Sequence, residues 1–217
     1  MKKITALILC AVMLLGLFAG CNKKDTAEST TASTINDIYE DATPAGTLYV
    51  SFGAAIEVIY DDEGNVLKIT GTNEVGKTIA AACNEQLGKG CVFAVRKMLR
   101  YASDNNLLGD AKSMVVRVGA GDPLPADDFL DTIATDTQYL ADEECTGIQM
   151  MRLEEDDDLD SAGNLIPEAA RLLAARYLGV AEEALSGEET IVDGLFTFSC
   201  GEKSCTVDAF TGLVSAK

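Results

Sequence analysis

The residues whose types and spacing point most clearly to ligand binding are carboxylates in the acidic segment 154–164. They stand at alternate positions, Asp156, Asp158 and Asp160, a spacing typical of the first ligands of a calcium-binding loop. The turn glycine and the bidentate glutamate that complete such a loop are both missing from the positions that follow. The three aspartates are therefore a weak calcium candidate, with a solvated acidic loop as the alternative. We predict no other metal site and no cofactor.

Cysteine supplies the second candidate chemistry, a disulfide. Cys200 and Cys205 flank a short turn, and we expect them to lie opposite each other across a hairpin, within bridging distance. Cys83 and Cys91 form a less constrained pair, and Cys145 is left over. The alternative is that all five thiols are unbridged. Zinc binding is not expected, because the paired C-x-x-C spacing of thiolate sites is absent.

Catalytic chemistry has little support, because the chain contains no histidine. This removes Ser-His and Cys-His nucleophilic catalysis together with the commonest transition-metal ligand. Neither a Gly-x-Ser-x-Gly elbow nor a Walker loop is present. Gly119-Ala120-Gly121 is similar to the start of a dinucleotide-binding loop, but the third glycine is missing, and we interpret it as an ordinary loop. We predict no catalytic residues and no enzymatic activity.

The chain is strongly acidic, with 35 Asp and Glu against 17 Lys and Arg and a formal net charge of −18. Such a charge repels nucleic acid and anionic lipid headgroups, so we predict no nucleic-acid partner. It favours association with cations and with basic proteins.

Residues 1–20 have the pattern of an export signal. Lys2 and Lys3 precede an apolar run over 4–18, and small residues follow before Cys21. The sequence LFAGC that ends this segment resembles the lipobox of bacterial lipoproteins. The resemblance implies cleavage after residue 20, diacylation of Cys21 and a place on the cell membrane, facing outside the cytoplasm. The alternative is an uncleaved signal-anchor helix, although the apolar run is shorter than the roughly 20 residues of a membrane span.

Residues 21–46 contain many Thr, Ser, Ala and Asp residues and few large apolar ones. We interpret them as the lipidated cysteine followed by a flexible tether, with a root-mean-square reach on the order of 25 to 30 Å. Such a tether would hold a folded part just clear of a membrane.

The elements that would position these side chains begin with a strand meander. Apolar segments at 48–52, 56–60 and 66–69 alternate inward and outward candidates, and an acid-rich turn containing Gly64 separates the last two. Helical spacing follows at 92–102.

Two strands and a helix complete this part of the chain. The runs 113–118 and 148–153 are expected to be strands. Between them a helix is expected to start at Pro125, because Asp127 and Asp128 then favour the positive end of its dipole.

This order of elements, with TNEVGK at 72–77 after the meander, resembles the extracytoplasmic middle domain of RsgI-like anti-sigma factors over about residues 48–153. The resemblance implies a mixed meander sheet with helices on one face, and a protein partner. Domains of that family are associated with self-cleavage at an Asn-Pro bond in the first strand. Residues 51–57 contain neither Asn nor Pro, so we predict no self-cleavage.

The last fifty residues form a separate pattern. A helix is expected over 167–178 and two strands at 195–200 and 204–208, and VDAFTGLV at 207–214 ends the pattern. This segment resembles a PepSY-type repeat, which implies a modulator of extracellular proteases.

The sequence thus predicts an α+β protein: a meander sheet with helices packed on one face, plus a C-terminal helix and β-hairpin. The folded parts span 47–166 and 167–217, and whether they share one core is left open, with 154–164 as the place for a boundary. The predicted function is a non-enzymatic, membrane-anchored protein-binding or sensing module, with a partner at the cell surface. The alternatives are a modulator or inhibitor of extracellular proteases, or a passive cell-envelope lipoprotein.

Overall fold

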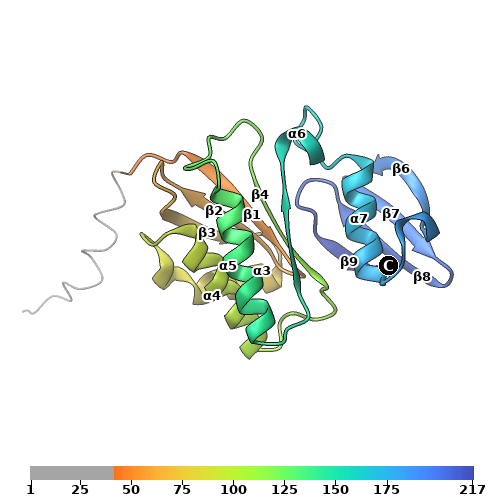
Figure 1. Ribbon diagram of the computed structural model, residues 1–217, viewed down its shortest axis with the longest axis horizontal. Coiled ribbons are helices and arrows are strands. Elements are labelled where there is room, and N and C mark those ends of the chain that lie inside the picture. Colours follow the sequence, from red (N-terminus) through yellow and green to blue (C-terminus); the bar gives the residue numbers. More distant parts are fainter. Residues whose placement is uncertain (1–41) are drawn as a thin grey trace, which may run out of the picture. The chain divides into compact units, whose positions relative to one another are not determined.

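The computed structural model describes residues 42–217, apart from the side chains of residues 188–190, and Figure 1 shows how their elements are arranged. The predicted signal peptide, Cys21 and most of the predicted tether lie outside the described residues. No helix within residues 42–217 combines the length and apolar character needed to cross a bilayer.

The first sheet has five strands in the order β3-β2-β1-β4-β5. The first three form the predicted antiparallel meander, β4 pairs antiparallel with β1, and β5 pairs parallel with β4. This mixed sheet with helices confirms the predicted α+β class. The strand bounds are Gly46–Ser51 for β1, Ala55–Tyr60 for β2, Val66–Gly71 for β3, Ser113–Val118 for β4 and Gln149–Leu153 for β5.

Three helices enclose an apolar core against one face of this sheet: α3 (Glu74–Ala82), α4 (Cys91–Asp104) and α5 (Phe129–Glu143). Each of these helices buries one apolar face. A 3-10 turn, η1 (Asn84–Gln86), links the first two helices.

Helix α5 begins later than the sequence predicts. It starts at Phe129 and not at Pro125, and residues 125–128 form a turn that leads into it. The physical reason is packing on the turn after β2. Pro125 and the Phe129 ring both lie against the backbone of Gly64, where an added Cβ would be 3.3 Å and 3.2 Å away. The Phe129 ring also packs on Tyr60, with centroids 5.3 Å apart.

The C-terminal residues build a second, four-stranded sheet in the order β6-β7-β8-β9, packed against helix α7. Figure 1 shows this part in blue. The predicted helix and hairpin are present as α7, β7 and β8, while β6 and β9 extend the sheet on both sides. The bounds are Glu155–Asp158 for α6, Pro167–Leu178 for α7, Glu182–Ala184 for η2, Ser186–Val192 for β6, Leu195–Cys200 for β7, Lys203–Asp208 for β8 and Val214–Ala216 for β9.

Strand β4 is buried on both faces. Met114 and Val116 point into the first core, while Val115 belongs to a second apolar cluster that includes Leu173 of α7. Gly212 lies against the same surface, with its would-be Cβ 3.3 Å from Val115. Residues 42–217 belong to one compact unit, and β4 contributes side chains to both of its cores.

A buried arginine lies on the second face of β4. Arg117 is fully buried, and its guanidinium carbon stacks 4.6 Å from the centroid of the Tyr49 ring and 4.3 Å from that of Phe210. None of its three guanidinium nitrogens has a hydrogen-bond partner among the described residues. Burial lowers the pKa of Arg117, although Tyr49 and Asp208 oppose that shift. The two aromatic contacts therefore compensate only part of the cost of removing this charge from water.

We expect Arg117→Met to leave the free energy of unfolding unchanged or to raise it by about 1 to 4 kcal/mol, because it removes a buried, unpaired charge and keeps a long apolar stem. Urea unfolding followed by circular dichroism measures this. Arg176→Met is the matched control, since Arg176 is exposed and its loss should change stability by less than about 0.5 kcal/mol. A loss of stability in Arg117→Met beyond about 2 kcal/mol would show that the guanidinium makes net stabilising interactions.

Candidate functional site

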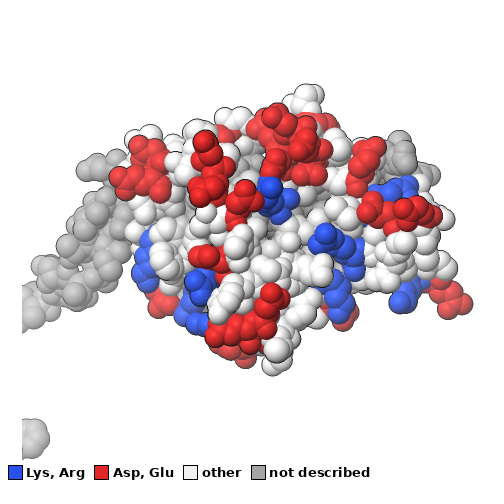
Figure 2. Space-filling model, viewed as in Figure 1, with Lys and Arg blue, Asp and Glu red and all other residues white. Residues whose placement is uncertain are grey.

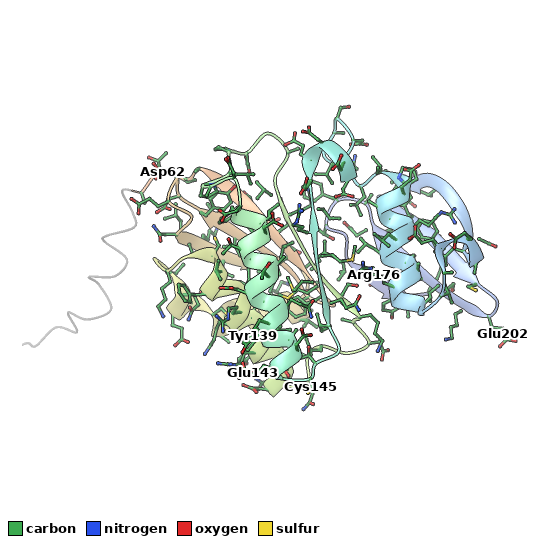
Figure 3. All side chains as sticks on the ribbon, viewed as in Figure 1. Asp62, Tyr139, Glu143, Cys145, Arg176 and Glu202 are labelled. Atoms are coloured by element: carbon green, nitrogen blue, oxygen red, sulfur yellow. The ribbon has the colours of Figure 1, made fainter. Side chains whose placement is uncertain are left out.

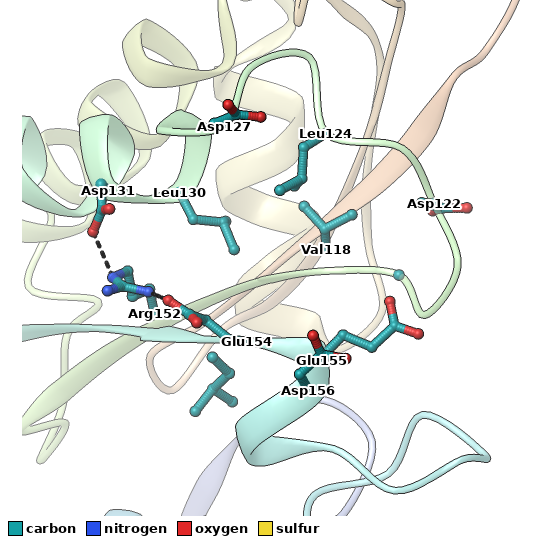
Figure 4. Close-up of a pocket in the computed structure, with 12 residues that line it drawn as sticks. Val118, Asp122, Leu124, Asp127, Leu130, Asp131, Arg152, Glu154, Glu155 and Asp156 are labelled. Atoms are coloured by element: carbon teal, nitrogen blue, oxygen red, sulfur yellow. Dashed lines mark ion pairs between the residues drawn. The ribbon is translucent and has the colours of Figure 1, made fainter.

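A cavity of about 300 Å³ lies at the carboxyl ends of the parallel strands β4 and β5. Helix α5 connects these two strands, so the residues that follow β4, the first turn of α5 and the residues that follow β5 all meet there (Figure 4). In open α/β sheets, ligands bind preferentially at this edge. We call this cavity the acidic pocket, for the residues described next.

The floor of the acidic pocket is apolar. Val118, Leu130 and Leu153 are buried side chains from β4, α5 and β5, and Leu124, 46 % exposed, lies beside them in the lining. Such a floor can accept the aliphatic part of a ligand.

Carboxylates surround this floor. Figure 2 shows Asp and Glu side chains gathered over α6, beside the pocket. Arg152 is the one cationic residue in the lining. The acidic lining residues are Asp122, Asp127, Asp131, Glu154, Glu155 and Asp156.

Two of these carboxylates are paired with Arg152. Its Nε lies 2.6 Å from Oδ1 of Asp131 on α5, and its Nη1 pairs with Oε1 of Glu154 (Figure 4). These ion pairs are partly exposed, so water screens them, and each contributes at most about 1 kcal/mol to stability.

Two further carboxylates bind backbone amides of the chain itself. Glu155 Oε2 accepts a hydrogen bond from the amide of Gly121 at 3.0 Å, and Asp122 Oδ2 accepts one from the amide of Thr47 at 2.8 Å. Gly119 of the Gly119-Ala120-Gly121 loop lines the pocket, but the amide of Gly121 already donates its hydrogen bond to a carboxylate. A phosphate entering here would meet carboxylates on all sides, which disfavours anion binding.

The remaining two carboxylates, Asp127 and Asp156, have no hydrogen-bond or ion-pair partner among residues 42–217. They are exposed to solvent and can pair with an incoming cation without losing a contact within the protein. The arrangement therefore suits an ammonium or guanidinium group with an aliphatic stem.

The structure does not bring the weak calcium candidates together. Asp156 lines the acidic pocket, whereas Asp158 Oδ2 accepts a hydrogen bond from the Glu154 amide at 2.9 Å. Asp160 Oδ1 accepts hydrogen bonds from the amides of Ala162 and Asn164, and these bonds close a local turn. Within the described part of the chain, no three acidic or cysteine side chains are placed to hold a metal ion.

The pKa values of Asp158 and Asp160 follow from these separate surroundings. Burial raises the pKa of the Asp158 carboxyl, and the neighbouring Asp157 raises it further. The amide hydrogen bond from Asn164 lowers the pKa of Asp160 below its usual value. One carboxylate is thus partly desolvated and the other is bound by amides of its own turn.

The expected opposition of Cys200 and Cys205 is wrong. Cys200 pairs with Lys203, and Cys205 pairs with Phe198, so the two thiols are offset along the hairpin. The reason is the turn, which contains only Gly201 and Glu202 between the paired strands. The five cysteines within residues 42–217 are all free thiols, and Cys145 is the exposed one.

Sequence reasoning missed the acidic pocket. Asp127 appeared only as a helix-start signal, and the loop at 119–121 was interpreted as an ordinary loop. The lining residues come from three separate segments, so no short motif contains them. The available signal was the expected pair of strands joined by a helix, because parallel strands of this kind end at one edge.

No family model matches the chain, and no curated protein matches it. The resemblance to RsgI-like and PepSY-type domains stays a prediction. The case for the site therefore depends on the geometry described above.

The thiols provide a test of the register at β7 and β8. We expect Cys145 to react first with Ellman's reagent in the native protein. Cys83, Cys91 and Cys205 should stay unreactive until the protein unfolds, because burial raises their pKa values to about 11, about 12 and about 11. Peptide mapping of the labelled protein measures the order. Recovery of a peptide that links Cys200 to Cys205 from air-exposed native protein would contradict this register.

Proposed function

We propose that this protein is a non-enzymatic binding module that receives a lysine or arginine side chain of a partner protein in the acidic pocket. The observation that carries the proposal is a cavity with an apolar floor, surrounded by six carboxylates and one arginine. On the sequence argument, Cys21 anchors the module to the cell membrane by lipid, and the partner lies outside the cytoplasm.

Both the net charge of the protein and the carboxylates of the pocket favour a cationic ligand. The net charge of −18 attracts basic proteins over distances up to about the Debye length, roughly 8 to 10 Å at physiological salt. Within the pocket, Asp127 and Asp156 contribute directly, since a unit charge about 5 Å away is worth roughly 0.8 kcal/mol even in water-like surroundings.

The shape of the site favours a side chain over a bare metal ion. The carboxylates are spread around the rim and do not converge, as the lack of a metal-type cluster within residues 42–217 shows. The apolar floor matches the methylene stem of a lysine or arginine. The volume of about 300 Å³ is at the low end of the range for small-ligand pockets, which suits one side chain.

The acidic pocket can be tested with N-α-acetyl-lysine amide and N-α-acetyl-arginine amide, titrated at low salt and followed by NMR. We expect both to bind, and the glutamate analogue not to bind. The double variant Asp127→Asn, Asp156→Asn should weaken binding about tenfold, because it removes the two unpaired carboxylates without breaking a described contact.

The matched control is Asp62→Asn with Glu202→Gln, which removes the same charge from exposed positions outside the pocket (Figure 3). This control should bind almost as tightly as the parent protein. Equal losses in the two double variants would mean that net charge, and not the pocket, attracts the ligand. No binding of either cation would favour the alternative of a passive envelope lipoprotein.

A further inference from the structure

A second hollow lies next to the acidic pocket, between helix α5 and strand β5. It is an open groove of about 520 Å³ with Tyr139 and Met150 among its lining residues. Asp131 and Arg152 line both the groove and the acidic pocket. The two hollows are therefore neighbours, and the ion pair between these residues stands where they meet.

Arg152 can leave both of its carboxylate partners at little cost. The Arg152 side chain is 38 % exposed, that of Asp131 60 % and that of Glu154 46 %, so water screens both attractions. A rotation of the flexible arginine side chain would join the pocket and the groove into one channel, and would leave Asp131 and Glu154 open to another cation.

The groove has an aromatic surface and an acidic border. Tyr139 is 69 % exposed on α5 (Figure 3), and Met150 on β5 is partly buried against the first core. Asp131 and Asp142 border the groove from the helix side. Gln138 Oε1 accepts a hydrogen bond from the amide of Met150 at 2.7 Å. A partner therefore cannot form a backbone hydrogen bond to that amide and must dock through its side chains.

We propose that the pocket and the groove form one site for an extended basic peptide segment of a partner protein. Its lysine or arginine enters the pocket and replaces Arg152 beside Asp131, and an aromatic or large aliphatic residue packs on Tyr139 and Met150. This inference rests on the proposed function. A second copy of the chain is not the occupant, because two molecules with a charge of −18 repel each other.

Geometry sets the spacing within the peptide. Asp131 and Tyr139 are eight residues apart on α5, a rise of about 12 Å. An extended chain covers about 3.3 Å per residue, so the apolar and the basic residue should be about four positions apart, and the probe peptide places the apolar one on the C-terminal side.

The test uses the full-length protein in a neutral detergent and three probes. These are N-α-acetyl-lysine amide, acetyl-Lys-Ser-Ser-Ser-Phe-amide and its isomer acetyl-Lys-Phe-Ser-Ser-Ser-amide. We expect the first pentapeptide to bind about tenfold more tightly than either of the others. Tyr139→Ser should abolish that gain. Phe93→Ser should keep it, because Phe93 is also an exposed helical aromatic, 61 % exposed on α4, but does not line the groove.

The two proposals can fail separately. If the lysine probe binds and the two pentapeptides bind no better, the groove is not part of the site and the pocket remains. If no probe binds, both proposals are wrong. Arg152→Gln should tighten the binding of the lysine probe several-fold, since Asp131 and Glu154 are then unpaired. An unchanged or weaker affinity would overturn the displacement of Arg152.

Discussion

The parallel pairing of β4 with β5 is the constraint on which the rest of the structure depends. Because both strands run in the same direction, the chain must cross over between them, and α5 makes that crossover over the first core. The same pairing makes both strands end at one edge, where residues from 118–131 and 152–156 meet around the pocket. Strand β4 also joins the two halves of the fold, since its second face is covered by the C-terminal residues that include Phe210 and Gly212.

The charges around the pocket are not equivalent. Glu155 and Asp122 accept hydrogen bonds from backbone amides of neighbouring loops. Asp131 and Glu154 form ion pairs with Arg152. Only Asp127 and Asp156 among the six lack such partners in the described chain, so part of the negative charge in the pocket is already neutralised before a ligand binds. Arg152 thus pairs with the pocket carboxylates as the cation of a ligand would.

The buried Arg117 differs from Arg152, because no carboxylate reaches its guanidinium and two aromatic rings pack against it in place of water.

The sequence predicted the parts of this fold that local pattern determines. Alternating apolar residues and a turn at Gly64 predicted the meander, and the helical pattern over 167–178 predicted helix α7 with its observed bounds. The start of α5 was wrong because packing of Phe129 on Tyr60 outweighs the helix-start signal at Pro125. The predicted opposition of Cys200 and Cys205 was wrong because the turn between β7 and β8 has only two residues, fewer than the prediction needed. The pocket could not be predicted from spacing, since it depends on the strand order, which brings distant segments together.

The most direct test of the cationic pocket is NMR chemical-shift mapping of N-α-acetyl-lysine amide on the ¹⁵N-labelled protein at low and at molar salt. We expect the shifted amides to fall in residues 119–122, 127–131 and 152–156, and the shifts to disappear when salt screens the carboxylates. Shifts spread evenly over the acidic surface, or concentrated on the sheet β6 to β9, would contradict it.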